Sequence, residues 1–324
     1  MKDFKHKSVL LNESINNLNI KEDGIYVDCT LGGGGHTYEI LKRINTGHVY
    51  SFDQDKMSID YNKQNLKNFL VSDKLTLIQD NFRNIYRDLM NYGCSKVDGI
   101  LYDLGVSSPQ LDLSNRGFSY QRKSPLDMRM DTSQDLTAEK IVNDWQLNDL
   151  VNIFQKYGEE KFSYSIAKRI VNIRKSHRIS DTEELSEIIK SSVPEKIRKK
   201  SHPAKKVFQA LRIVVNDELN SLSRSLTDAL TMLNLHGRIC CITFQPLEDQ
   251  IVQKIFKKNS RVNVPRDLPI VPKQLQPKYK MITKKAISPS ENELKDNHRA
   301  HSAKLRVIEK VLESTNGTKY NTSV

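Results

Sequence analysis

The sequence contains few cysteines and no long hydrophobic segment. Four cysteines occur among 324 residues. None forms a C-x-x-C pair and no Cys/His cluster has zinc-ligand spacing, so we expect reduced, buried thiols and no metal site. Among the longest apolar runs is 239–242, which is far too short to cross a bilayer, and no apolar stretch of signal-peptide length follows the N-terminus. These absences predict a cytoplasmic protein without a membrane partner.

Acidic residues are also in deficit, which gives the chain a formal net charge of +12. Residues 254–324 hold 16 Lys or Arg against 6 Asp or Glu, and residues 196–206 hold six basic residues and no acid. A solvated helix surface normally interleaves both signs, so these stretches favour a phosphate-binding surface and a polyanionic partner. The general abundance of Lys, Asn and Ile is an alternative explanation for the net charge, but it does not explain where the charge lies.

The first hundred residues alternate between strand and helix patterns. Strands bounded by turn residues and separated by amphipathic helices indicate βαβ units, and therefore an α/β fold with a parallel sheet. The expected strands are 24–30, 47–53, 75–79 and 97–103, and the expected helices between them are 35–44, 56–70 and 82–91.

The alternation stops after the fourth strand. Residues 112–205 show helical periodicity without a good strand, and Asp181 is a candidate N-cap, with Thr182 as an alternative. A long helix is expected over 206–234. Strands at 237–244 and 303–308 then flank a helix over 247–258. We therefore expect a discontinuous α/β domain, 1–111 and 206–324, interrupted by a helical substrate-recognition domain, 112–205.

Four consecutive glycines, 32–35, follow the first strand and precede His36. Glycines between a strand and a helix let a ligand lie against bare backbone at a helix N-terminus. A phosphate-binding P-loop would need Lys-Ser or Lys-Thr after the glycines, and the dinucleotide fingerprint would need a glycine at Thr37. Both fail, which leaves an adenosyl sulfonium compound as the predicted ligand; a purely structural turn is the alternative.

Two further positions suit the adenosine part of such a ligand. Asp53 ends the second strand, where a carboxylate can accept hydrogen bonds from ribose hydroxyls, and we prefer it over Asp55 because a ribose-binding acid belongs at the strand end. Phe82 follows the third strand, where an aromatic ring can cover adenine. A plain core role for Phe82 remains open, because aromatic side chains are often buried.

The segment 103–112 follows the fourth strand and carries an acid, two serines, a proline and an amide. Such a short polar segment suits the positioning of an exocyclic amine, whose lone pair is withdrawn into the ring. Transfer of a methyl group to that nitrogen then depends mainly on orientation. The candidates for this catalytic role are Asp103, Ser107 and Ser108, with Asp103 as the proposed proton acceptor.

At this point the chain resembles the bacterial 16S ribosomal RNA cytosine-N4 methyltransferases of the RsmH (MraW) type, over about residues 6–309. The longest matching stretch is 98–112, and Pro125–Asp131 is also specific. The remaining matches are 6–13, 30–36, 116–119, 157–162, 202–204, 208–213 and 247–249.

The resemblance implies a class I S-adenosylmethionine-dependent methyltransferase (Rossmann-like) sheet with an inserted helical domain. It implies S-adenosylmethionine as cofactor, a decoding-region cytidine of 16S rRNA in the small ribosomal subunit as substrate, and RNA binding. An oligomeric state is not implied, and both a monomer and a homodimer remain open. The cofactor-binding residues implied are Gly34, Gly35, His36, Asp53, Phe82, Asp103 and Gln110, to which we add Gly33 of the same turn.

Two departures from the family pattern bear on activity. Gln245 stands where the family usually has histidine, and His301 where it has a second arginine. If either family residue touches substrate, rate or affinity changes here, although Gln245 could still hydrogen-bond a base edge. Separately, the loop Pro125–Asp131 either forms a structural ion-pair loop or contacts RNA through Arg129.

Two other functions compete with the RNA methyltransferase. A non-catalytic RNA-binding assembly factor could keep the cofactor as a structural ligand, but the intact segment 103–110 argues against decayed chemistry. A DNA amine methyltransferase should carry a polar-Pro-Pro-aromatic motif after the fourth strand, and residues 107–110 do not form one.

Overall fold

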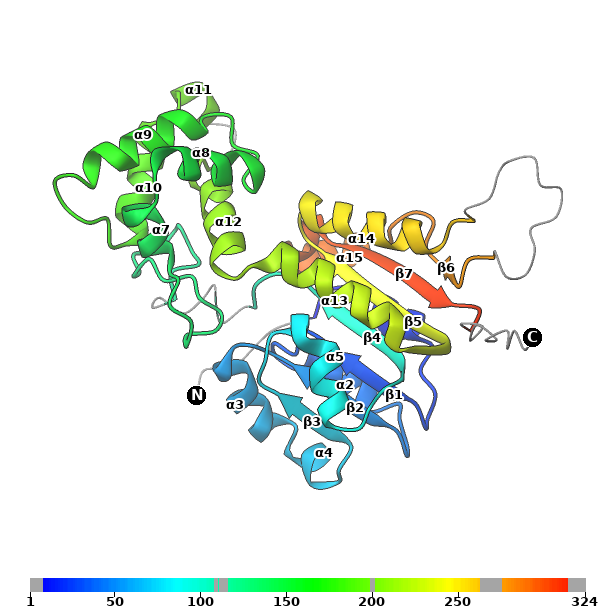
Figure 1. Cartoon of the computed structure of the whole chain (residues 1–324). Coiled ribbons are helices and arrows are strands. Elements are labelled where there is room, and N and C mark those ends of the chain that lie inside the picture. Colours follow the sequence, from blue (N-terminus) through cyan, green and yellow to red (C-terminus); the bar gives the residue numbers. More distant parts are fainter. Residues whose placement is uncertain (1–7, 108–109, 111–115, 199–201, 263–275, 314–324) are drawn as a thin grey trace, which may run out of the picture. The chain divides into compact units, whose positions relative to one another are not determined.

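A computed structural model describes residues 8–107, 110, 116–198, 202–262 and 276–313. Within them lies a seven-stranded sheet in the order β3-β2-β1-β4-β5-β7-β6 (Figure 1). β1 to β5 are parallel, and β7 runs antiparallel to both β5 and β6. The strands are β1 (Ile25–Asp28), β2 (His48–Phe52), β3 (Leu75–Ile78), β4 (Val97–Asp103), β5 (Leu233–Thr243), β6 (Tyr279–Met281) and β7 (Lys304–Lys310).

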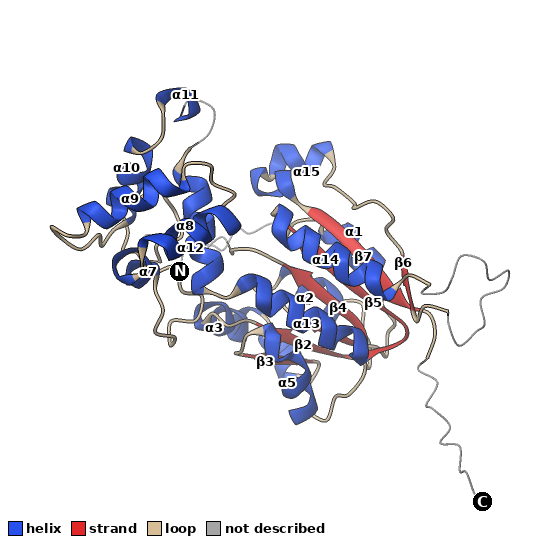
Figure 2. Ribbon diagram, turned by 45° about the horizontal axis from the view of Figure 1, so that its top comes forward, coloured by secondary structure: helices blue, strands red, loops and turns tan. Residues whose placement is uncertain are grey.

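Apolar residues on both faces of the strands explain why helices cover both sides of this sheet (Figure 2). Successive strand residues point to opposite faces, and accordingly Tyr26 packs in one buried cluster while Val27 packs in the other. The α1 and α2 side chains belong to the first cluster, and those of α5, α13 and α14 belong to the second. The helices around the sheet are α1 (Leu11–Leu18), α2 (Gly35–Leu41), α3 (Lys56–Asn65), α4 (Lys67–Val71), α5 (Ile85–Asn91), α13 (Glu218–Met232), α14 (Pro246–Asn259) and α15 (Glu291–Asp296), with 3-10 helices η1 (Phe82–Asn84) and η3 (His298–Ser302).

The chain divides into two compact units. Among the described residues, unit 1 takes those within 54–57 and 106–221, and unit 2 takes those within 8–53, 58–105 and 222–313. Unit 2 carries the sheet. The expected insertion, 112–205, falls within unit 1. Unit 1 is larger than this insertion, because the turn after β2 and the segments on both sides of the insertion also pack with its helices.

Unit 1 is built from helices around a buried core of its own. This core contains aliphatic side chains together with the rings of Phe118 and Phe154. Local signals set the helix ends: the Asp181 carboxylate accepts the Glu184 amide at 2.9 Å, which confirms Asp181 as the N-cap. The helices are α7 (Ala138–Asp144), α8 (Leu147–Lys156), α9 (Ser163–Ile173), α10 (Thr182–Ser191), α11 (Glu195–Arg198) and α12 (Ala204–Val215).

Two expected helices are each divided in two: residues 56–70 form α3 and α4, with Leu66 between them, and residues 206–234 are divided as well. The single helix over 206–234 is two helices, α12 and α13, because Asn216 ends the first and Asp217 has a left-handed φ of 48°. The Asn216 amide group is taken up by tertiary contacts: it donates to the carbonyl of Met128 at 2.8 Å and accepts from the amide of Met130 at 2.7 Å. Periodicity across the two helices does not reveal such a break.

No helix among the described residues is long and apolar enough to span a membrane.

Candidate active site

The carboxyl ends of β2, β1 and β4 lie side by side in unit 2. β1 pairs with β2 on one side and with β4 on the other, so the order of the strands reverses beside β1. In open parallel sheets, ligands bind outside the carboxyl ends of the strands at such a point. Asp28, Asp53 and Asp103 stand at these three ends.

The glycine turn connects β1 to the N-terminus of α2. Gly34 has φ +80°, and a Cβ there would lie 2.1 Å from Asn62 Oδ1. At Gly35 a Cβ would lie 2.2 Å from Ser8 Oγ. Gly33 sits in the same turn. Positive φ and close packing therefore both require glycine at position 34, and the turn leaves its backbone bare at the strand ends.

Asp53 is joined directly to this turn, because its Oδ2 accepts the Gly32 amide at 2.9 Å. The rival candidate, Asp55, belongs to unit 1 and is almost completely buried. Its carboxylate accepts the Met57 amide at 3.0 Å and the Gln110 amide group at 2.9 Å. Asp53 therefore stays the predicted ribose partner, since Asp55 is engaged in holding its own unit together.

Asp103 begins the segment that follows β4, and its side chain is mostly buried. Its Oδ2 lies 3.5 Å from His36 Nδ1, and its backbone amide donates to Thr30 Oγ1 at 2.7 Å. Burial raises the pKa of the Asp103 carboxyl well above its ordinary value, and the carboxylates of Asp28 and Glu248 raise it further. Its Oδ1 is buried and has no partner within the described part of the chain. The Asp103 carboxylate is thus a stronger base than an ordinary aspartate, and one of its oxygens has no hydrogen-bond partner among the described residues.

Sequence reasoning assigned no role of its own to Asp28, the fully buried residue that supports this site. Its carboxylate accepts the Thr37 hydroxyl at 2.8 Å and the Thr30 amide at 3.0 Å, which ties the end of β1 to α2. Burial raises the pKa of the Asp28 carboxyl. The available signal was a carboxylate within an apolar strand, followed by threonines at 30 and 37.

Phe82 lies at the start of η1, half-buried, with its ring 5.7 Å from that of Tyr102 in an edge-to-face arrangement. It packs against the sheet core on one side. This placement suits both roles left open by the sequence, so its contact with a cofactor stays a prediction.

The segment after β4, which the sequence predicts to position the amine, belongs to unit 1 from residue 106 onward. The Ser107 amide donates to Gln110 Oε1 at 3.0 Å, and Gln110 Nε2 donates to Asp55. Ser108 lies outside the described residues. The structure therefore joins Ser107 to Gln110, while the roles proposed for these residues stay predictions.

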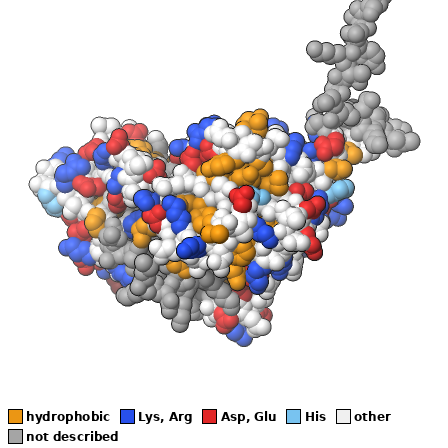
Figure 3. Space-filling view, turned by 90° about the horizontal axis from the view of Figure 1, so that it is seen from below, with side chains coloured by type: hydrophobic (Ala, Val, Ile, Leu, Met, Phe, Trp, Pro, Cys, Tyr) orange, Lys and Arg blue, Asp and Glu red, His pale blue; other side chains and the backbone are white. Residues whose placement is uncertain are grey.

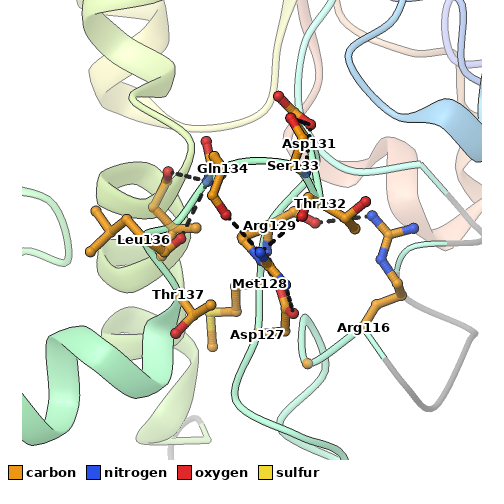
Figure 4. A network of polar contacts seen from close by, with 12 residues as sticks. Arg116, Asp127, Met128, Arg129, Asp131, Thr132, Ser133, Gln134, Leu136 and Thr137 are labelled. Carbon is orange, nitrogen blue, oxygen red and sulfur yellow. Dashed lines mark hydrogen bonds and ion pairs between the residues drawn. The ribbon is translucent and has the colours of Figure 1, made fainter.

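The loop Pro125–Asp131 is held together by Arg129, as Figure 4 shows. Its Nε and Nη2 donate to the two oxygens of Asp127, at 2.9 and 2.8 Å, and Nη1 donates to the carbonyls of Thr132 and Gln134. Burial alone would raise the pKa of Asp127, but hydrogen bonds from Arg129 outweigh it and lower that pKa. Because Nε, Nη1 and Nη2 of Arg129 all donate hydrogen bonds within this loop, the contacts favour a structural role for Arg129 over contact with RNA.

Gln245 forms the N-terminal cap of α14 in unit 2. Its Nε2 donates to Glu248 Oε1 at 2.9 Å, and Glu248 Oε2 accepts the amides of Phe244 and Gln245. The Gln245 side chain is almost completely buried. This departure from the family pattern therefore acts as a helix cap, whereas the other departure, His301, lies exposed in η3.

Comparison with known proteins gives a consistent result. Residues 3–311 match the model of the MraW methylase family. The ribosomal RNA small subunit methyltransferase H of Lactiplantibacillus plantarum is 52% identical over 314 residues, which cover 96% of this chain and 98% of that protein. The protein of the same name from Streptococcus mutans is 51% identical, over 95% of this chain and 98% of its own.

Solved structures resemble the chain more distantly. A putative rRNA methylase from Clostridium thermocellum has a TM-score of 0.43 at 14% identity, with 95% of this chain and 100% of that one covered. A putative methyltransferase from Streptococcus mutans in complex with SAH has a TM-score of 0.44 at 12% identity, with 94% and 100% covered.

The family match and the order of the sheet agree with each other. A sheet with five adjacent parallel strands, an antiparallel β7 between β5 and the edge strand β6, and a glycine turn after β1 is the Rossmann-like methyltransferase sheet that the resemblance implies. By the match over nearly its whole length, the chain belongs to the MraW methylase family.

Proposed function

We propose that this protein transfers a methyl group from S-adenosylmethionine to the N4 exocyclic amine of a decoding-region cytidine in 16S rRNA. Membership of the family supports methyl transfer, and the names of the relatives support small-subunit rRNA as substrate. The observation that carries the proposal is the meeting of Asp53, Asp103 and the glycine turn at the carboxyl ends of adjacent parallel strands.

The residues at these strand ends fit the cofactor. The turn around Gly34 offers bare backbone, Asp53 stands beside it as an acceptor for ribose hydroxyls, and the buried Oδ1 of Asp103 needs a donor. The proposed binding residues are Gly33, Gly34, Gly35, His36, Asp53, Phe82, Asp103 and Gln110. When bound, S-adenosylmethionine supplies an electrophilic methyl group on a sulfonium.

The task of the protein is then to orient the amine and take up a proton. One N–H bond of the amine is lost as its nitrogen gains the methyl group, and the proton needs an acceptor. Asp103 is the acceptor we propose: its carboxylate form takes up the proton lost by the amine, and its raised pKa makes that carboxylate a stronger base than an ordinary aspartate. Ser107 and Ser108 are proposed to hold the amine through hydrogen bonds.

The test uses small ribosomal subunits from cells that lack this gene, together with S-adenosylmethionine carrying a labelled methyl group. After digestion to nucleosides, we expect the label in N4-methylcytidine. Asp103→Ala should abolish labelling, whereas Glu187→Gln, on an exposed side chain of α10, should leave it unchanged. Label in another nucleoside would overturn the cytosine-N4 assignment.

A non-catalytic assembly factor is the second candidate. It predicts binding of cofactor and subunit, both measurable by calorimetry and sedimentation, without any labelled nucleoside. Turnover in the labelling assay would exclude it.

A further inference from the structure

One helix of unit 1 carries an unusual distribution of charge. Residues 161–180 contain six Lys or Arg and no Asp or Glu, and α9 lies within this segment. α9 buries Ile166, Ala167 and Ile170 in the core of the unit and packs against α8 and α10. Its opposite side is exposed to solvent.

Two of the six basic residues have structural partners. Arg174 Nη1 donates to the Val142 carbonyl at 2.7 Å, and burial lowers the pKa of Arg174. Arg178 lies 3.2 Å from a Glu139 oxygen and 3.1 Å from an Asp144 oxygen. Both arginines therefore fasten α9 and its following turn to α7.

The other four basic side chains are different, because all are exposed and none forms an ion pair with another described residue. They are Lys161, Lys168, Arg169 and Lys175. We call these four residues, together with Tyr164, the α9 surface.

Tyr164 supplies an exposed aromatic ring on this surface. Its side chain is 55% exposed, and Lys168, one helical turn later, places Nζ 5.9 Å from the centre of the ring. Residues four apart lie on one face of a helix. The α9 surface thus combines cations that form no ion pair with an aromatic ring that is exposed to water.

An ordinary solvated helix offers a different arrangement. On α10, the exposed Lys190 lies 3.0 Å from Glu187, so this lysine has an acid beside it on the same helix. On the molecular face shown in Figure 3, Lys and Arg are likewise interspersed with Asp and Glu. α9 therefore differs from α10 in that its exposed surface carries one sign of charge, with no acid on the same helix to neutralise it.

We propose that the α9 surface binds the substrate RNA, with its cations on backbone phosphates and the Tyr164 ring against an unpaired base. Phosphates neutralise lysine and arginine with release of counterions, and aromatic rings stack on bases of single-stranded RNA. The inference rests on the proposed function, since it names the surface through which that enzyme holds its RNA.

The experiment compares two triple variants of the full-length protein. K168Q/R169Q/K175Q removes three cations of the α9 surface. K140Q/K156Q/K190Q removes three exposed lysines of α7, α8 and α10 and is the matched control. Both are measured for binding to unmethylated small subunits at several salt concentrations, and for KM and kcat of methyl transfer.

The α9 variant should bind about tenfold or more weakly, and the slope of log affinity against log salt should fall in magnitude by about 2, as expected for three lost phosphate contacts. KM should rise while kcat at saturating subunit stays unchanged. An equal loss of affinity in the control variant would show that only the net charge of the protein matters, and would overturn the proposal. An unchanged KM in the α9 variant would also overturn it. Failure of the wild-type protein to methylate would instead overturn the proposed function.

Tyr164 gives a second, independent test. Tyr164→Phe should retain the affinity for subunits, because the ring is kept, whereas Tyr164→Ser should weaken it by about fivefold or more. Circular dichroism and thermal unfolding identify any folding defect, which is not expected at an exposed position. Equal affinity of both variants would remove the ring from the proposal.

Discussion

Arg116 and Asp55 form a buried ion pair, with 2.8 Å between Nη2 and Oδ2. The same Asp55 oxygen accepts the Gln110 side chain, and Arg116 also donates to the carbonyls of Arg129 and Met130. Each of the three residues in contact is at most 7% exposed. The pair therefore fixes the turn after β2, the segment at Gln110 and the loop 127–131 to one another within unit 1.

Breaking this pair should destabilise the protein strongly. Arg116→Met leaves the Asp55 carboxylate buried without its cation, which typically lowers the free energy of unfolding by about 3–5 kcal/mol. The measurement is urea denaturation. The double variant Asp55→Asn/Arg116→Met should lose less than the sum of the single variants, because the uncompensated charge is gone. Additive losses would mean that the two side chains do not act as a pair.

Replacing Gly34 should impair cofactor binding. Gly34→Ala places a Cβ 2.1 Å from Asn62 Oδ1 at φ +80°, so the turn must shift. Gly93→Ala is the matched control, because Gly93 has φ +71° but no atom within 4 Å of the added carbon. We expect the control to lose only about 1–2 kcal/mol of stability and to keep its affinity for S-adenosylmethionine in calorimetry. Equal affinities in both variants would contradict the role of the turn.

Removing the charge of Asp103 should separate stability from activity. The pKa of Asp103 is raised in the folded protein, so its contribution to stability is present below the unfolded pKa and is lost as pH rises through the folded pKa. Asp103→Asn should therefore be more stable than wild type at pH values above the folded pKa. Methyl transfer should fall by about 10²-fold or more, as for loss of a proton acceptor. Denaturation at several pH values and the labelling assay test the two effects, and a less stable variant at high pH would refute the burial argument.

Gln245 should matter for stability and not for the reaction. Gln245→Ala removes the side-chain cap of α14, which should lower the free energy of unfolding by about 1 kcal/mol. kcat and KM for small subunits should stay at the wild-type values. A change in KM without a change in stability would instead show that Gln245 contacts the RNA.

Much of the fold could be predicted from local patterns. Strands β1 to β4 begin or end within two residues of the expected positions, because apolar runs bounded by Gly, Asp and Asn mark buried parallel strands. β6 was missed: three residues with one buried side chain carry no periodic signal, and the strand exists through its pairing with β7. The break at Asn216 was missed because its hydrogen-bond partners, Met128 and Met130, are distant in the sequence.

The sequence by itself determined the α/β class, the glycine turn and the carboxylates expected at the strand ends, because each is encoded in a short stretch of neighbouring residues. Only the tertiary structure showed that Asp53 bonds to the glycine turn while Asp55 pairs with Arg116. It also showed that Asp28 ties the end of β1 to α2, and it separated the arginines that fasten α9 from the cations that face solvent. Those distinctions depend on burial and on partners up to 61 residues apart in the sequence, such as Asp55 and Arg116. A local sequence pattern does not predict which donor will bond to which carboxylate.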